Sequence, residues 1–134
     1  MRVLAIPYAR LALGTVFIWF GLLKVISLSP ASPLVFGLLE ITLPAVDHVI
    51  FGIVLGILEM VIGIAFLIPR CERIAMALLI PHMITTFLPL FFMPSVVWQS
   101  FLVPTMEGQY IIKNLIIIAL AFGIAAQMHP FHAK

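Results

Sequence analysis

Charged residues and cysteines are scarce in this chain, and each scarcity excludes a class of protein. Only 9% of the 134 residues are charged while 64% are hydrophobic, a balance that soluble domains of this size do not have. The single cysteine, Cys71, rules out an internal disulfide and a CxxC dithiol relay. The net charge of +2 comes without a basic run, so nucleic acid is not an expected partner. The composition predicts an integral membrane protein made of one membrane domain, residues 1–134.

Four apolar stretches are each long enough to cross a bilayer. The predicted transmembrane segments are residues 11–28, 48–68, 74–92 and 110–127. Lys24 interrupts the first stretch and no convincing cleavage site follows it, so we expect a retained helix rather than a cleaved signal peptide. Pro81 and Pro89 fall inside the third segment and are expected to kink it. The remaining boundary prolines are expected just outside the segments: Pro7, Pro30, Pro44, Pro69, Pro94 and Pro130.

The cationic residues predict how these segments cross the membrane. In a four-segment arrangement, one side carries Arg2, Arg10, Arg70, Arg73 and Lys134. The other side has only Lys24 and Lys113, both inside helix ends. The positive-inside rule therefore places both termini in the cytoplasm.

The two outer connections are too short to cross the bilayer. Residues 32–44 begin with Ser32-Pro33, a pair suited to the N-cap and first position of a helix of roughly 10 residues. Residues 95–104 have a similar character, with Trp98 as an interfacial anchor. The expected fold is an all-α membrane protein, a four-transmembrane-helix bundle with short interfacial helices in both outer connections.

Glu59 lies near the middle of the second segment, where inserting a carboxylate costs about 2.5–3.5 kcal/mol. Its neighbours at spacings of four, three and four share one helical face: Gly52, Gly56, Glu59 and Gly63. Gly14 and Gly21 are further expected helix-packing positions, in the first segment. We therefore expect Glu59 to face a partner helix rather than lipid.

Each of the other segments also contributes one ionisable group. Counted from the cytoplasmic ends, Glu59 lies roughly 16 Å deep, His82 roughly 13 Å, and Lys24 and Lys113 roughly 21 Å. A lysine stem can reach back by a helical turn, so these groups are expected near one another. Two lysines, one carboxylate and one histidine leave a positive excess. With an apolar cavity at Glu59, such a site would suit a small anion or the carbonyls of a quinone.

Structural explanations stay open for each of these residues. Lys24 and Lys113 can snorkel to the outer headgroups, and His82 can bond a carbonyl freed by the neighbouring proline. Glu59 cannot snorkel from the middle of the membrane. Its structural alternative is an ion pair with a lysine, or a protonated carboxyl bonded to a neighbouring helix.

The sequence offers few side chains that could bind a haem or a metal ion. A haem held by two histidines is excluded because His48 lies at the outer end of its segment and His82 near the middle. His82 and Glu59 supply only two metal ligands, so no metal site is predicted. His129 and His132 are expected to be solvated in the C-terminal tail. No covalently bound cofactor is expected, and a quinone is the candidate ligand.

Short motifs over nearly the whole chain resemble the DoxX family of small four-helix membrane proteins. They are Phe20-Gly21-Leu22-Leu23-Lys24, Glu59 among its spaced glycines, Arg73-Ile74-Ala75, and residues 107–114 (EGQYIIKN). The broad family is similar to DoxD, the membrane subunit of thiosulfate:quinone oxidoreductase, and includes members tied to sulfur and oxidative-stress metabolism. The resemblance implies an integral membrane subunit of a quinone-linked redox system.

On this interpretation Glu59 and His82 would transfer protons. A quinone or sulfur oxyanion would be bound by Lys24, Lys113, Asn114 and Glu107. Without a dithiol or resident cofactor, electrons would need a direct two-electron step or a partner subunit. The alternative is a non-catalytic accessory subunit of a larger respiratory complex, in which the polar residues serve helix pairing. A small transporter is disfavoured because 134 residues provide no inverted repeat. Whether the chain is an enzyme is left open.

Overall fold

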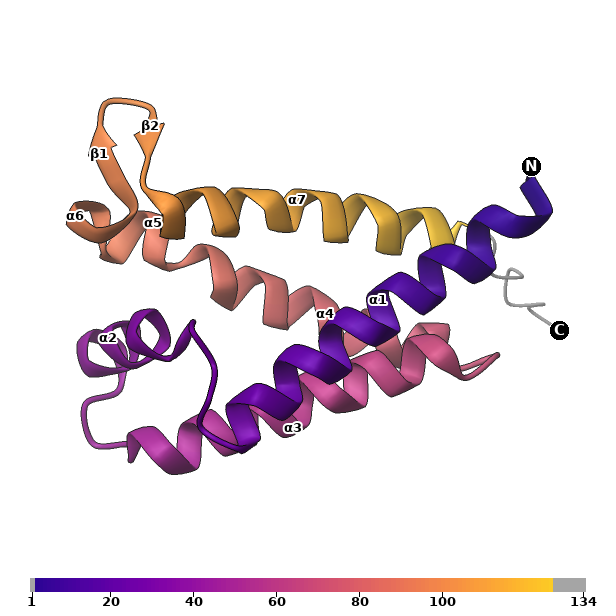
Figure 1. Cartoon of the computed structure of the whole chain (residues 1–134), viewed down its shortest axis with the longest axis horizontal. Coiled ribbons are helices and arrows are strands. Elements are labelled where there is room, and N and C mark those ends of the chain that lie inside the picture. Colours follow the sequence, from indigo (N-terminus) through magenta and orange to yellow (C-terminus); the bar gives the residue numbers. More distant parts are fainter. Residues whose placement is uncertain (1, 127–134) are drawn as a thin grey trace, which may run out of the picture.

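The computed structural model of the chain is mostly helical and describes residues 2–126, with side chains from residue 4 onward. Within that range, four helical segments are long and apolar enough to cross a membrane. They are α1 (Arg2–Val25), α3 (His48–Leu67), α4 (Glu72–Phe87) with its extension α5 (Pro89–Phe92), and α7 (Met106–Ala125). Figure 1 shows these helices running roughly along one axis, with α1 lying along α3 and α4 facing α7. The expectation of a helical fold with four such segments is confirmed.

The first and last helices begin earlier than the sequence predicts. Helix α1 begins at Arg2 rather than at residue 11, so Pro7 lies inside the helix and not outside it. A proline within the first turns removes one backbone donor and is tolerated there more easily than in a helix centre. Helix α7 begins at Met106 rather than at residue 110, because the Thr105 hydroxyl caps it by accepting from the Gly108 amide at 3.2 Å.

The third segment is interrupted at one of its two internal prolines. Helix α4 continues through Pro81 and ends at Phe87, and α5 begins directly after Leu88 with Pro89 at its first position. Pro89 cannot donate a backbone hydrogen bond, and its fixed φ suits the first position of a new helix. The second segment corresponds to α3, which ends one residue before the predicted boundary.

One end of the bundle collects basic residues. The beginning of α1, the turn between α3 and α4, and the end of α7 all lie there (Figure 1). We call this the basic end; it carries Arg10, Arg70 and Arg73. The opposite end is called the far end. The predicted tail positions His129, His132 and Lys134 lie outside the described residues.

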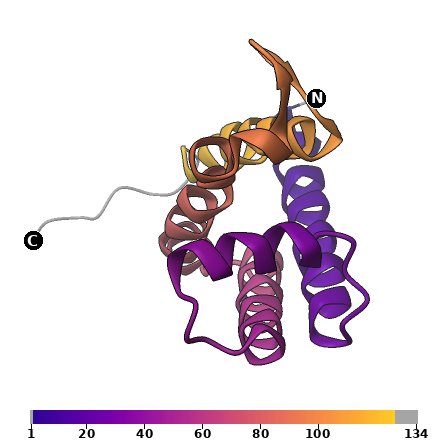
Figure 2. The same cartoon turned by 90° about the vertical axis from the view of Figure 1, so that its left-hand side faces the viewer.

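Helix α2 (Ser32–Thr42) lies across the far end of the bundle (Figure 2). Ala31 occupies the N-cap position without a side-chain hydrogen bond, so Ser32 is one position further inside the helix than predicted. Leu39 is buried, and the Phe36 ring stacks on His48 with centroids 5.2 Å apart. The helix is therefore held against the start of α3 by its own apolar face.

The second far-end connection is not the interfacial helix that the sequence predicts. It consists of a single turn, α6 (Pro94–Val97), followed by an antiparallel hairpin of β1 (Trp98–Ser100) and β2 (Val103–Pro104). Valines and aromatic residues favour extended backbone over helix in this segment, and Pro104 ends the second strand. The Trp98 indole donates to the Leu90 carbonyl at 3.3 Å, which ties the hairpin to α5.

Glycines allow α1 and α3 to approach until their backbones touch. A methyl group on Gly21 would lie 2.5 Å from the Gly56 carbonyl oxygen, and one on Gly56 would lie 2.5 Å from the Gly21 carbonyl oxygen. About two helical turns further along α3, a methyl group on Gly63 would lie 2.8 Å from the Gly14 carbonyl oxygen. Gly52 instead faces the Phe36 ring. Four of the five predicted packing glycines thus form one helix–helix seam.

This seam predicts the effect of adding a single methyl group. Gly21→Ala should lower the free energy of unfolding by about 1–3 kcal/mol, because the new Cβ forces two backbones apart. The measurement is unfolding by SDS titration in mixed micelles. Gly123→Ala on α7 is the matched control: no atom lies within 4 Å of its Cβ position. That variant should be neutral or slightly more stable. Equal effects of the two substitutions would contradict a tight seam.

Candidate functional site

Glu59 is buried at the point where α1, α3 and α4 meet. Its side chain is 8% exposed and both carboxylate oxygens have a partner. Oε2 accepts from the Lys24 ammonium at 2.7 Å, and Oε1 lies 3.2 Å from Nε2 of His82. We call these three residues the buried triad. Each comes from a different helix, so the triad joins the closely packed α1–α3 pair to α4.

Lys24 reaches Glu59 from the last turn of α1 because the glycine seam brings its stem close. A methyl group on Gly56 would lie 3.0 Å from Lys24 Cβ, which places the lysine stem against the glycine surface of α3. The side chain then extends along α3, and only a tenth of it is exposed. Snorkelling away from the bundle does not occur here, since the ammonium is engaged by the carboxylate.

His82 is the most buried member of the triad, with a side chain that is 3% exposed. Phe17 of α1 contacts its ring edge-on, with centroids 6.0 Å apart. The imidazole does not bond a carbonyl freed by Pro81: Nε2 faces Glu59, and Nδ1 is buried without a hydrogen-bond partner among the described residues. A ring that donates from Nε2 leaves Nδ1 with either an unused lone pair or an unused proton. Nδ1 is therefore a buried atom of the triad that makes no hydrogen bond among the described residues.

Three other predicted site residues lie away from the triad. Lys113 is exposed, and its ammonium sits 5.1 Å from the centre of the Tyr110 ring. The Asn114 amide donates to the Thr86 hydroxyl at 3.5 Å, which links α7 to α4. Glu107 is exposed in the first turn of α7. The structure thus gathers groups from three helices, while α7 contributes no charged group to Glu59.

The charge at the triad depends on the histidine. Lys24 and Glu59 cancel one another, so a neutral His82 gives a neutral triad and a protonated one gives a single positive charge. Ion pairs held at low exposure interact much more strongly than ion pairs in water, because the local dielectric is low. The arrangement can therefore hold one carboxylate, one cation and one exchangeable proton within hydrogen-bonding distance.

A second polar group lies at the basic end and was not singled out from the sequence. Arg10 of α1 pairs with Glu72 at the start of α4, and its Nε donates to the Phe66 carbonyl at 2.8 Å. This arrangement closes the end of α3 against α1 and α4. Arg10 was predicted on the cytoplasmic side, and Glu72 lies in the sequence between Arg70 and Arg73, which were predicted on the same side. This shared location was the available signal.

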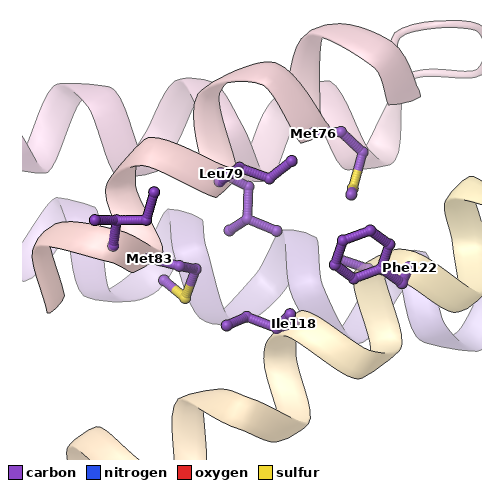
Figure 3. Close-up of a pocket in the computed structure, with 8 residues that line it drawn as sticks. Met76, Leu79, Met83, Ile118 and Phe122 are labelled. Carbon is purple, nitrogen blue, oxygen red and sulfur yellow. The ribbon is translucent and has the colours of Figure 1, made fainter. Parts of the chain in front are cut away.

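The cavity resolved in the described residues is apolar and lies away from the triad. It has a volume of about 120 Å³ between α4 and α7 and is lined mainly by Met76, Leu79, Met83, Ile118 and Phe122 (Figure 3). Neither Glu59 nor Lys24 lines it. Leu79 and Met83, which line the cavity, are close to His82 along α4, but His82 is not part of the lining. Within the triad itself, the chain's own side chains fill the space around the carboxylate.

No group of three or more His, Cys, Asp or Glu side chains within residues 2–126 is arranged to hold a metal ion.

Comparisons with protein-family models, curated proteins and solved structures find no match to this chain.

The triad predicts a measurable coupling between Lys24 and Glu59. Lys24→Met should destabilise the protein by about 3–5 kcal/mol, because it leaves a buried carboxylate without its lysine. Lys24→Met combined with Glu59→Gln should recover most of that loss, since no uncompensated charge then remains. Unfolding in mixed micelles measures both. Lys113→Met is the control and should change stability by no more than about 0.5 kcal/mol. If Lys24→Met left the stability unchanged, the Lys24–Glu59 pair would contribute nothing to it.

Proposed function

We propose that this chain is an integral membrane protein of a prokaryotic inner membrane, with its basic end in the cytoplasm. Its four apolar helical segments are each long enough to cross a bilayer. Their basic residues collect at one end, as the positive-inside rule requires for the cytoplasmic side. The bilayer is then the surroundings of the outward-facing apolar residues, such as Ile84 and Ile116.

Within that membrane, the chain would serve as a DoxX-like subunit of a quinone-linked redox system, with reduced sulfur compounds as the electron donors or with a role in oxidative stress. The buried triad carries this proposal. Membrane proteins keep ionisable groups at such depth mostly for transport of charge, proton transfer or specific pairing. Glu59 and His82 face each other at 3.2 Å, a distance over which a proton passes between a carboxylate and an imidazole.

The roles of the three residues follow from their contacts. Reduction of a quinone consumes two electrons and two protons, and neither electron can come from a side chain of this triad. The electrons come from the reduced sulfur compound or a partner subunit. For each proton delivered, His82 gives the proton on Nδ1 to the quinone and takes the proton of a protonated Glu59 carboxyl at Nε2. Glu59 is then left as a carboxylate, and water reprotonates it before the second proton is delivered. Lys24 holds the Glu59 side chain in place through its hydrogen bond. Lys113 and Asn114 contact Tyr110 and Thr86 rather than the triad, so with Glu107 they would take no direct part in this proton transfer.

A second function is favoured by a different observation. Both oxygens of Glu59 are satisfied by the chain's own groups, and the resolved cavity is lined without it. An accessory subunit of a larger membrane complex would have this arrangement, with the triad joining α1, α3 and α4. Other membrane subunits would then cover part of the exposed apolar surface.

Glu59→Gln separates the two functions. If Glu59 transfers protons, the substitution should lower quinone reduction by about 10²–10⁴-fold in the protein purified with its native partners. The assay follows quinol formation. Glu40→Gln, at an exposed acidic position on α2 with no assigned role, is the matched control and should retain full turnover.

Wild-type turnover in Glu59→Gln would reject the proton-transfer role. Native purification with mass spectrometry gives an independent answer. Recovery of the chain as a quinone-free subunit of a larger oxidase would support the accessory function instead.

A further inference from the structure

The far end carries a feature that the buried triad does not use, the tip of the β1–β2 hairpin. Strand residues Ser100 and Val103 are paired, so the turn consists of two residues, Phe101 and Leu102. Phe101 is 90% exposed and Leu102 is 73% exposed. Among the large apolar side chains of the described residues, Phe101 has the greatest exposure. Two adjacent apolar side chains thus form the outermost point of the hairpin.

These residues contradict the usual chemistry of a two-residue hairpin turn. Such turns favour Asn-Gly, Asp-Gly or Gly-Gly, because their backbone needs positive φ angles. Leu102 has φ of 59°, a conformation that a branched apolar residue adopts only at a cost in strain. The sequence therefore retains an apolar turn with a strained Leu102 where a polar turn would be more stable. Breaks of a local rule of this kind concentrate at functional positions.

The base of the hairpin fixes the direction in which the tip points. The Thr105 amide donates to the Val97 carbonyl at 2.9 Å, and the Thr105 hydroxyl donates to the Val96 carbonyl at 2.8 Å. Val97 is fully buried, and Gly108 of α7 packs directly against its carbonyl. The hairpin is thus anchored to the first turn of α7. It does not hang from the bundle as a free loop.

The hairpin projects sideways from the bundle. Both views show it extending beyond α7, at a steep angle to the axis of that helix (Figures 1 and 2). If α7 crosses a bilayer, this direction runs along the membrane plane, and the tip lies over the surrounding lipid. The first turns of α7, to which the hairpin is attached, carry Met106 and Tyr110 on one helical face, both about two-thirds exposed. Tyrosine is typical of the boundary between headgroups and acyl chains.

We propose that the hairpin is a lateral membrane foot: Phe101 and Leu102 insert into the headgroup–acyl boundary of the outer leaflet beside α7. The occupant of this surface is lipid, because the tip continues the outward apolar side of α7 at its outer end. Insertion buries two apolar side chains that water would otherwise surround. It also fixes the depth of α7 and of the far-end elements attached to it. The inference rests on the proposed crossing of the membrane, and its test reports on the two separately.

The test places a fluorescent probe at the tip of the full-length chain in lipid vesicles. Phe101→Cys in a Cys71→Ser background is labelled with an environment-sensitive NBD group and reconstituted in phosphatidylcholine–phosphatidylglycerol vesicles. Brominated acyl chains quench a probe in lipid, and aqueous iodide quenches a probe in water. The foot predicts blue-shifted emission, strong quenching by bromine and little by iodide, unchanged when the protein is diluted in lipid. Adding Leu102→Asn, which suits the turn but removes the apolar side chain, should increase iodide quenching.

Quenching of the Phe101 probe by iodide would overturn the proposal. Protection from both quenchers that disappears on dilution would also overturn it, in favour of contact with a second copy. Ile116→Cys, labelled in the same background, is the reference for the membrane itself. If brominated lipid quenches the probe at position 116 and iodide quenches the probe at position 101, only the insertion of the hairpin is rejected. If iodide quenches the probe at position 116, the crossing of the membrane by α7 is rejected, and with it the insertion of the hairpin that depends on it.

Discussion

The approach of α1 and α3 across their glycines is the constraint on which the rest of the structure depends. At Gly21 and Gly56 each backbone occupies the space that a Cβ on the other would need. That separation places the stem of Lys24 against α3 and allows its ammonium to meet Glu59. With larger residues in the seam, the same lysine would be displaced outward, and the carboxylate would lose its only permanent cation. The ion pair can therefore be buried because the small residues let the two helices pack closely.

Burial of Glu59 in turn determines how α4 joins the pair. A carboxylate has two oxygens, and Lys24 satisfies one of them. The second faces His82, which brings α4 to the same point. Because Phe17 and the neighbouring apolar residues exclude water from this site, its electrostatic interactions are strong. The remaining unpartnered atom, Nδ1 of His82, is where the triad differs from a purely structural ion pair.

Much of this arrangement could be predicted from composition and periodicity. The four long apolar stretches gave the helices, and the glycine spacing around Glu59 gave the face on which α1 packs. The depth comparison suggested that Lys24 and His82 could reach Glu59, and both do. It also suggested the same for Lys113, which lies near Tyr110 instead. Depth along a helix is readable from the sequence, but the direction in which a side chain points around the helix axis depends on packing against other helices.

Helix ends and the far-end hairpin were harder to predict for local reasons. The Thr105 cap extends α7 by four residues, and α1 tolerates Pro7 near its start. Residues 95–104 are apolar enough for an interfacial helix, and only their β-branched and aromatic content favours strands. Phe101-Leu102 gives no ordinary turn signal, so a hairpin was not expected there. This segment combines two departures from local sequence rules, an apolar two-residue turn and a positive φ at Leu102.

The central claim is that Glu59 exchanges a proton and does not serve only as the partner of Lys24. Infrared difference spectroscopy of the protein with its native partners, recorded between the oxidised and reduced quinone states, tests it most directly. The account predicts a carboxyl C=O band that changes on reduction in the wild-type protein and is missing in Glu59→Gln. A wild-type spectrum without any carboxyl change, during normal quinone reduction, would contradict the claim and leave Glu59 as a structural ion-pair partner.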